Sequence, residues 1–255
     1  HTLPDTPPPA DAVVHPALGG QSFPFLCGAG VAWQTARALL SDAGEWLDLC
    51  ALATIADMVP LTGENRALAY AGLKALTNTK RAGLIALKKI AGVTGEVTGE
   101  IAAFALAPRL NASGRMESAE SALNLLLTDD PEEAEALAAR LDHLNKERKR
   151  AEDNVLAAAE GMVARMDLTA RRAIVLCGEE FPSGVVGLAA GRIAEKYGYP
   201  TVVFTREGNN AVGSARSAAG VDIYEALKEE NDLFLRFGGH KQAAGLTLPY
   251  DKLDE

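Results

Sequence analysis

Residues 173–204 read AIVLCGEEFPSGVVGLAAGRIAEKYGYPTVVF. The apolar runs at 173–176 and 201–204 are typical of buried strands, and residues 185–197 have the apolar spacing of an amphipathic helix. A strand, a helix and a second strand predict a βαβ unit. Three further elements complete an expected α/β domain from about residue 170 onward: strands over 211–214 and 245–248 and a helix over 222–229.

The segment before this unit predicts one long helix. Asp130 supplies an N-capping carboxylate, Pro131 suits the first helical position, and two glutamates follow near the positive end of the helix dipole. Apolar residues then keep helical spacing from Ala134 to Met166. The basic run at 146–150 is interpreted as a solvated face of this helix. We therefore expect a helix that connects two domains.

The first part of the chain predicts a mostly helical domain. It begins with a proline-rich segment that includes a brief expected strand at 12–14. Apolar residues at three- and four-residue spacing predict six helices, over 30–40, 45–57, 64–76, 84–91, 97–106 and 118–127. The fold class is therefore α/β, with a helical part over 1–129, a connecting helix over 130–168 and a smaller α/β domain over 169–255.

Composition limits the classes of function. With 255 residues, 48% of them apolar, the chain is long enough for one large domain or two ordinary ones, and its net charge of −9 argues against a broad polyanion-binding surface. A local basic site is still compatible with this charge. The three cysteines have no CxxC spacing, which excludes a zinc knuckle and fits a reducing cytoplasm. No apolar run approaches the ~20 residues of a membrane span.

Two glycine-containing segments near the C-terminus predict an anion site. One is Phe237-Gly238-Gly239-His240 and the other is Gly213-Ser214-Ala215-Arg216-Ser217. Glycines let the backbone approach a ligand closely, and histidine and arginine donate hydrogen bonds to anionic oxygen. A tight turn with an incidental histidine would explain a glycine pair taken alone. The combination of both segments favours a phosphate site.

Asp57 is a candidate site residue in the helical part. It lies within the apolar segment TIADMVPL, residues 54–61. Burying a lone carboxylate is costly, so we expect Asp57 to have a cation, a metal or hydrogen-bond donors beside it. Both an arginine partner and a hard metal ion remain open on spacing alone.

Residues 107–116, APRLNASGRM, form a second candidate segment, which we expect to be a loop between helices. Arg109 and Arg115 carry forked guanidinium groups that suit bidentate capture of phosphate. The alternative is that these arginines pair with acidic residues of the neighbouring helix, such as Glu117 and Glu120.

Six motifs, read in order, resemble the RecJ family of single-stranded-DNA-specific exonucleases in the DHH phosphoesterase superfamily. They are DLCALATIADMVPLTGEN at 48–65, PRLNASGRM at 108–116, LLLTDDPEEA at 125–134, GVVGLAAGRIAEKYGYP at 184–200, GSARS at 213–217 and FGGHKQAAG at 237–245. The resemblance implies that residues 1–129 are the C-terminal portion of a DHH domain and that 169–255 are the DHH-associated nucleic-acid-binding domain. It also makes His1 similar to the second histidine of the DHH signature.

The resemblance implies metal-dependent phosphodiester hydrolysis. Two Mn²⁺ or Mg²⁺ ions would lie in a cleft between the two domains and activate a water molecule. Asp57 matches a metal-ligand aspartate and His1 a histidine beside the metals, so these two are the implied catalytic residues. The implied substrate-binding residues are Arg109, Asn111, Arg115, Ser214, Arg216, Ser217, Gly238, Gly239 and His240.

The implied reaction is 5′ to 3′ digestion of single-stranded DNA, bound especially at 5′ ends, in repair and recombination. A repair helicase or a single-strand-binding protein is the implied further partner. The upstream DxD and DxG-type motifs of the family are absent here, so we expect a fragment with little or no nuclease activity of its own. Two alternatives stay open: a phosphodiesterase of the superfamily for short oligonucleotides or cyclic dinucleotides, and a catalytically inactive nucleic-acid-binding module.

Overall fold

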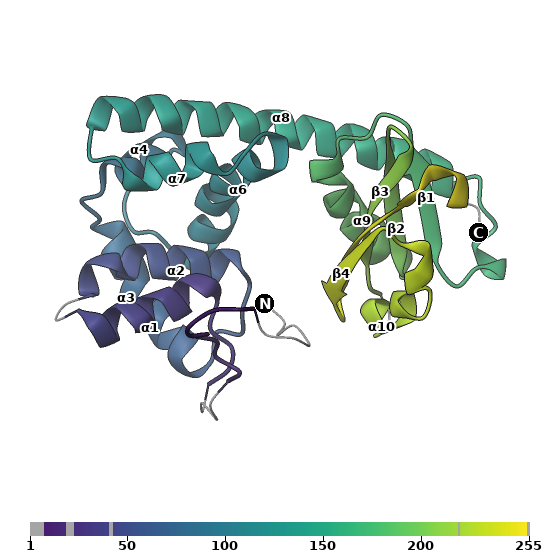
Figure 1. Cartoon of the computed structure of the whole chain (residues 1–255). Helices are drawn as coiled ribbons and strands as arrows, with labels where there is room; N and C mark the ends of the chain where they lie inside the picture. The colour runs from purple at the N-terminus through teal and green to yellow at the C-terminus, as the bar shows by residue number, and fades with distance from the viewer. Residues whose placement is uncertain (1–7, 19–22, 41–42, 219, 254–255) are drawn as a thin grey trace. The chain divides into compact units, whose positions relative to one another are not determined.

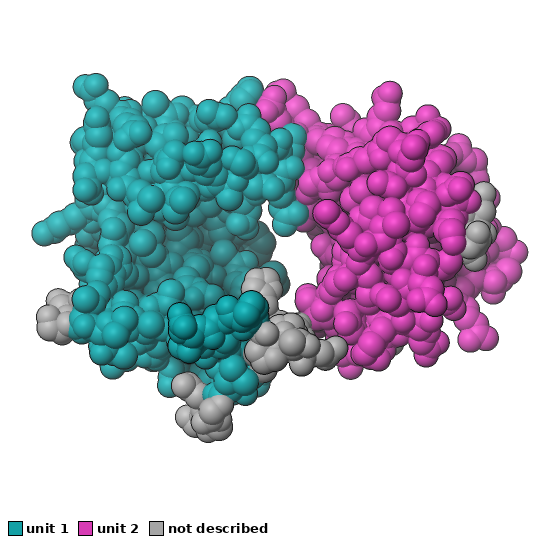
Figure 2. Space-filling view, viewed as in Figure 1, with its two compact units in different colours: residues 1–145 teal, residues 146–255 magenta. Residues whose placement is uncertain are grey.

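The computed structural model describes residues 8–18, 23–40, 43–218 and 220–253 (Figure 1). The chain forms two compact units, unit 1 over residues 1–145 and unit 2 over residues 146–255 (Figure 2). His1 lies outside the described residues. Within the described part, no helix combines the length and apolar character needed to cross a membrane.

Unit 1 is helical, as expected. Its elements are α1 (Gly28–Leu39), the 3₁₀ turn η1 (Gly44–Trp46), α2 (Leu47–Ala56), α3 (Gly63–Thr77), α4 (Ala82–Ile90), α5 (Gly99–Ile101), the π-helical turn η2 (Ala102–Leu106), α6 (Ala107–Met116) and α7 (Glu120–Leu127). The strand expected at 12–14 is wrong, because these residues have no strand assignment.

The loop expected over 107–116 is also wrong, since these residues form helix α6. Pro108 is compatible with this helix because it lies in the first turn, where its missing N–H is not required. The preceding turn, η2, is π-helical. The guanidinium of Arg109 donates a hydrogen bond of 2.6 Å to the carbonyl of Ala105 in this turn. Local composition therefore suggested a loop where the backbone is helical.

Helix α8 (Pro131–Val163) contains 33 residues and contributes its first part to unit 1 and the rest to unit 2. Its start follows the expected capping pattern, with the side chain of Asp130 accepting a 2.9 Å hydrogen bond from the N–H of Glu132. The basic run in its middle is only partly solvated. Arg148 is buried at 9% exposure and pairs with Glu152 one turn later.

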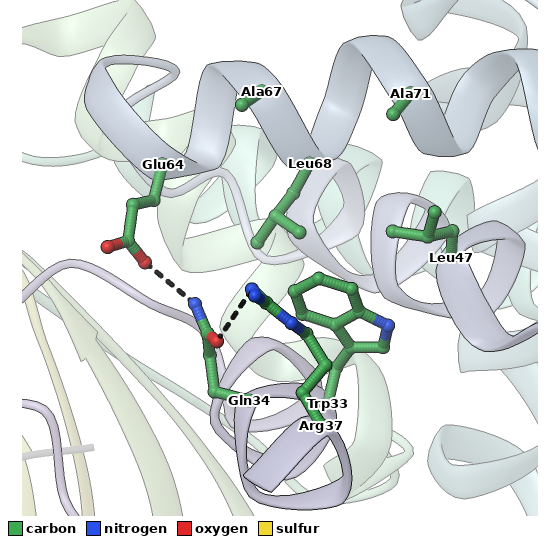
Figure 3. A pocket seen from close by; sticks show the side chains of 8 residues that line it. All are labelled: Trp33, Gln34, Arg37, Leu47, Glu64, Ala67, Leu68 and Ala71. Carbon is green, nitrogen blue, oxygen red and sulfur yellow. Dashed lines mark hydrogen bonds between the residues drawn. The ribbon is translucent and has the colours of Figure 1, made fainter. Parts of the chain in front are cut away.

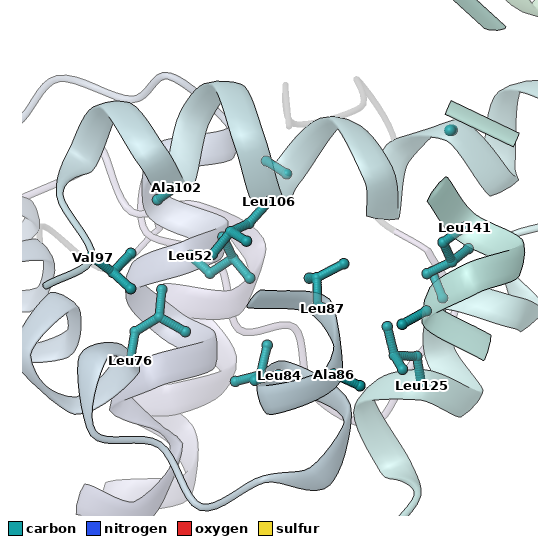
Figure 4. Packing of buried hydrophobic residues seen from close by; sticks show 14 of the residues in the cluster. Leu52, Leu76, Leu84, Ala86, Leu87, Val97, Ala102, Leu106, Leu125 and Leu141 are labelled. Carbon is teal, nitrogen blue, oxygen red and sulfur yellow. The ribbon is translucent and has the colours of Figure 1, made fainter. Parts of the chain in front are cut away.

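The core of unit 1 consists of aliphatic side chains from successive helices (Figure 4). The labelled members are Leu52, Leu76, Leu84, Ala86, Leu87, Val97, Ala102, Leu106, Leu125 and Leu141. Helices α2 and α3 approach closely at Gly72, where an ideal Cβ would lie 2.2 Å from the carbonyl oxygen of Leu47. Close packing at this crossing therefore requires a residue without a side chain.

Unit 2 contains a five-stranded sheet with strand order β1-β2-β3-β5-β4. Its elements are η3 (Leu168–Ala170), β1 (Ile174–Gly178), α9 (Ser183–Tyr197), β2 (Thr201–Glu207), β3 (Asn210–Arg216), α10 (Ile223–Lys228), η4 (Asn231–Leu233), β4 (Arg236–His240), β5 (Ala243–Pro249) and η5 (Tyr250–Lys252). Strands β1 and β2 are parallel and are joined by α9, which confirms the expected βαβ unit. The remaining strand pairs are antiparallel.

The two faces of this sheet bury different clusters. On one face, side chains of β1 and β2 pack with α8 and α9, including Val203, Ile193 and Ala159. On the other face, alternate residues of β2, β3 and β5 pack with Ile223 of α10. Helix α9 lies against β2 and β3. This alternation fixes the direction of each side chain along the strands.

Two glycine substitutions test the helix packing. We expect Gly72→Ala to lower the free energy of unfolding by about 2 kcal/mol, because the new methyl group would overlap the backbone of α2. Gly161 is exposed in α8 with no heavy atom within 4 Å of an ideal Cβ, so Gly161→Ala is expected to raise it by roughly 0.5–1 kcal/mol. Urea unfolding followed by circular dichroism checks both. Equal stability of Gly72→Ala and the parent chain would contradict the close crossing.

Candidate functional site

Strand pairing in unit 2 brings the two glycine-containing segments together. Strand β5 lies between β3 and β4 and pairs antiparallel with both. Arg216 is paired with Ala243, and Ala243 is paired with His240. Two residues further along the strands, a second row of paired residues contains Ser214, Gly245 and Gly238. Residues about 25 positions apart in the sequence thus become neighbours across three strands.

These side chains share one face of the sheet, because directly paired residues point to the same side and every second residue along a strand does so too. We call this surface the glycine face, made of Ser214, Arg216, Gly238, His240, Ala243 and Gly245. Gly238 and Gly245 are exposed, and an ideal Cβ on either would meet no heavy atom within 4 Å. A ligand can therefore approach the backbone closely there.

Arg216 is held against the sheet. Its guanidinium Nη1 donates hydrogen bonds of 2.6 Å to Ser214 Oγ and 2.8 Å to the Ala215 carbonyl oxygen. Helix α9 passes over this pair at Gly187, where an ideal Cβ would lie 2.8 Å from both Arg216 Nη2 and Ser214 Oγ. The Arg216 guanidinium can thus lie between the sheet and α9 because residue 187 of α9 has no side chain.

A pocket of about 350 Å³ lies beside Arg216, between the second half of α9 and the end of β3. Its lining residues are Gly191, Ala194, Glu195, Gly198, Arg216, Ser217 and Ala218. Ser217 follows β3, and its N–H donates a 2.9 Å hydrogen bond to the Gln242 carbonyl oxygen. Its hydroxyl donates to the Val221 carbonyl oxygen. The sequence-predicted residues Arg216 and Ser217 therefore line one cavity.

His240 is exposed at the end of β4. Its Nδ1 accepts a 3.2 Å hydrogen bond from the N–H of Gln242, so the neutral ring carries its proton on Nε2. The Nε2–H group is then a donor for an anionic oxygen. Gly239 is not part of the glycine face. It lies between Gly238 and His240 on β4, and successive residues of a strand point to opposite sides of the sheet. An ideal Cβ there would lie 2.3 Å from the Ala243 carbonyl oxygen.

The predicted burial of Asp57 is wrong. Asp57 is exposed and forms the C-cap of α2, and Met58 follows in the left-handed region with φ of 55° and 88% exposure. The chain turns toward solvent at this point, so the apolar neighbours of Asp57 do not enclose it. Within the described residues no arginine pairs with Asp57. The buried carboxylate of this helix is Asp48, which accepts a 2.7 Å hydrogen bond from Thr79.

The three predicted residues of α6 do not share one surface. Arg109 forms a 2.9 Å ion pair with Asp142 of α8, with side chains only 17% and 9% exposed. Asn111 and Arg115 are exposed and lie one turn apart on another side of the helix. The alternative in which Arg109 pairs with Glu117 or Glu120 is wrong, because its partner Asp142 comes from α8. Glu117 instead pairs with Arg140 of α8.

The described residues do not form a metal centre. Among them, no three His, Cys, Asp or Glu side chains lie together as metal ligands would. Burial raises the pKa of the Cys50 thiol to about 11, so it stays protonated near neutral pH and is a poor ligand. Asp57 therefore does not complete a two-metal site with the other described residues.

Unit 1 contains a further cavity of about 360 Å³ between α1, α2 and α3 (Figure 3). Its lining residues are Trp33, Gln34, Arg37, Leu47, Glu64, Ala67, Leu68 and Ala71. The Gln34 amide donates to Glu64 at 2.9 Å, and Arg37 donates to Gln34 at 3.2 Å while lying over the Trp33 ring. The side chains of Gln34, Arg37 and Glu64 thus bond to one another, the Trp33 indole N–H donates to the Ala43 carbonyl oxygen, and the other lining is apolar.

Residues 170–255 match the family model described as the DHHA1 domain. RecJ of Bacillus subtilis, a single-stranded-DNA-specific exonuclease, is 44% identical over 247 residues, which cover 94% of this chain and 31% of that protein. The crystal structure of RecJ from Thermus thermophilus in complex with Mn²⁺ has a TM-score of 0.88 at 40% identity and covers 100% of this chain and 38% of that one. The corresponding Mg²⁺ complex has a TM-score of 0.83 at 39% identity and covers 94% and 38%.

The chain spans between 31% and 49% of the length of the curated relatives it matches. Both the sequence and the structure comparisons extend over nearly all of its residues. Residues 170–255 are thus a DHHA1 domain, and along its whole length the chain matches RecJ in sequence and in fold.

Proposed function

We propose that this chain is the strand-binding portion of a single-stranded-DNA-specific 5′–3′ exonuclease in DNA repair and recombination, and that the glycine face holds phosphates of the strand. Its matched relatives are single-stranded-DNA-specific exonucleases. The observation that carries the proposal is the row of Arg216, Ala243 and His240 beside the open glycines.

The glycine face supplies the groups that a phosphate requires. Arg216 offers a fixed guanidinium, because Ser214 and the Ala215 carbonyl hold its Nη1. His240 offers a second donor through Nε2. Since Gly238 and Gly245 have no side chains, a phosphodiester can lie directly on the sheet between these donors. Charge-assisted bonds of this kind are the stronger class of hydrogen bond.

We further propose Mn²⁺ or Mg²⁺ as the metal of the whole enzyme, because the matched Thermus thermophilus structures contain these ions. When bound, such ions lower the pKa of a water molecule and stabilise charge on the phosphoryl group. Asp57 and His1 are the proposed contributions of this chain, and the exposure of Asp57 leaves its carboxylate accessible.

The other residue assignments are part of the same proposal. Asn111 and Arg115 are exposed on α6 and are proposed to contact the strand, as is Ser217. Arg109, in its ion pair with Asp142, and Gly239, which faces the other side of the sheet, are proposed to support the site without touching the strand. Residues 1–129 are assigned to the C-terminal portion of a DHH domain, 130–168 to the connecting helix and 169–255 to the nucleic-acid-binding domain. The proposed partner is a repair helicase or a single-strand-binding protein, and the proposed compartment is the cytoplasm. The three free cysteines are consistent with a reducing compartment.

Removal of the Arg216 side chain tests the proposed function. We expect Arg216→Ala to weaken binding of 5′-phosphorylated single-stranded DNA by about 1–3 kcal/mol, because a charge-assisted contact is lost. Fluorescence anisotropy with a 3′-labelled oligothymidylate and EDTA measures the affinity without hydrolysis. Arg206→Ala is the matched control, since Arg206 lies on β2 opposite Ala211 and faces the other side of the sheet. Equal affinity of the two variants would remove Arg216 from the site.

A second pair of variants tests how α9 positions Arg216. Gly187→Ala would insert a methyl group 2.8 Å from the Arg216 guanidinium, and we expect it to cost roughly 1 kcal/mol of binding free energy. At Gly191 a methyl group would lie 3.9 Å from Arg216 Cγ, an ordinary contact, so Gly191→Ala should bind like the parent chain. The same anisotropy titration compares them, with thermal melts to verify folding. Wild-type affinity in Gly187→Ala would contradict this role.

A further inference from the structure

We infer that Arg236 is a second phosphate anchor on the glycine face, which holds a nucleotide further along a single strand than the one at Arg216 and His240. This inference rests on the proposed function and adds to it a residue and a minimum ligand length. It follows from the register of β4, from the exposure of Arg236 and from the lack of a competing partner for its guanidinium among the described residues.

The register of β4 gives Arg236 its direction. Arg236, Gly238 and His240 alternate along the strand and are paired with Thr247, Gly245 and Ala243 of β5. The intervening Phe237 faces the other side, where its ring stacks on Tyr224 at 5.1 Å and on Phe234 at 5.4 Å. Because neighbours along a strand point to opposite faces, Arg236 projects on the same side as Gly238 and His240.

Spacing along β4 suits an extended polyanion. With a rise of about 3.4 Å per residue, Arg236 lies roughly 7 Å from Gly238 and roughly 14 Å from His240. Successive phosphates of an extended single strand are separated by a step similar to two residues of a β-strand. The donor groups of Arg236 and His240 therefore match separate phosphates, and the intervening open glycine leaves space for the linkage between them.

The guanidinium of Arg236 is available for a ligand. Arg236 is exposed, and within the described part of unit 2 it has no hydrogen bond or ion pair. By contrast, Arg206 donates to the Gly208 carbonyl and stacks on Tyr250 at 4.3 Å, and Arg148 pairs with Glu152. Binding at Arg236 thus breaks no internal interaction among the described residues.

The ligand class follows from this arrangement. One phosphate group can engage Arg216 and His240, whereas Arg236 requires a ligand with a further phosphate along the strand. Thymidine 5′-phosphate is therefore expected to contact only Arg216 and His240, whereas a hexamer such as d(pT)₆ is expected to contact Arg236 as well. The number of phosphates contacted also sets the salt dependence of binding, with a slope of about 0.7 per phosphate for single strands.

The experiment compares Arg236→Ala, Arg236→Lys and the control Arg206→Ala in the full 255-residue chain. Anisotropy gives the affinity for labelled d(pT)₆, and competition with unlabelled thymidine 5′-phosphate gives the affinity for one nucleotide. We expect Arg236→Ala to bind d(pT)₆ about tenfold more weakly, with a salt slope reduced by about 0.7, and to bind the mononucleotide unchanged. Arg236→Lys should keep most of the affinity, because a point charge suffices for a phosphate contact.

The outcomes separate this inference from the proposed function. If Arg236→Ala binds d(pT)₆ like Arg206→Ala while Arg216→Ala loses affinity, Arg236 is not an anchor and the proposed function stands. If Arg236→Ala also loses the mononucleotide, Arg236 contacts the first phosphate and the inference is overturned. If Arg216→Ala binds both ligands like Arg206→Ala, the proposed function itself fails. Arg236→Gln, which keeps the length of the side chain, repeats each comparison if the alanine variant unfolds.

Discussion

The glycine face depends on the close approach of β4 to β5 at Gly239. A Cβ at this position would lie 2.3 Å from the Ala243 carbonyl oxygen and 2.6 Å from Ala244 Cα, so only glycine lets the two strands pair there. Without this pairing, His240 would leave the row that it shares with Arg216. The missing side chain at Gly239 thus lets β4 pair with β5, and this pairing places His240 of β4 in one row with Arg216 of β3.

Local periodicity predicted most helices and the βαβ unit, whereas the features that depend on tertiary contacts were not predicted. The βαβ unit was predictable because its apolar patterns are local, whereas β4 was missed because glycines have low strand propensity and offer nothing to pack. The sequence predicted that Arg216 and His240 belong to one anion site. That they lie in one row could not be predicted, because it depends on β5 pairing with both β3 and β4. Asp57 appeared buried from its apolar neighbours, and the left-handed turn at Met58 could not be inferred from them. Gly187 resembled an ordinary helix residue until its contact with the Arg216 side chain was known.

An acidic chain can bind a polyanion because electrostatic interactions in salt solution are short-ranged. At an ionic strength of 0.1 M the Debye length is about 10 Å, so distant surface carboxylates contribute little at the glycine face. Glu195 is the nearby exception, since it lines the same pocket as Arg216. A phosphate that lies toward β4 rather than toward the second half of α9 would avoid this carboxylate. Electrostatics therefore favours the open glycines over the pocket as the place for the strand.

In unit 1, the ion pair between Arg109 and Asp142 limits which groups of α6 can contact a ligand. Both side chains are largely buried, and removing one partner of a buried pair typically costs about 3–5 kcal/mol because the other charge is left uncompensated. Releasing Arg109 to a phosphate would incur much of this cost. Asn111 follows two residues later, about 200° around the helix axis, and is exposed together with Arg115. The pair that fixes α6 to α8 therefore leaves Asn111, rather than Arg109, able to contact a strand at little energetic cost.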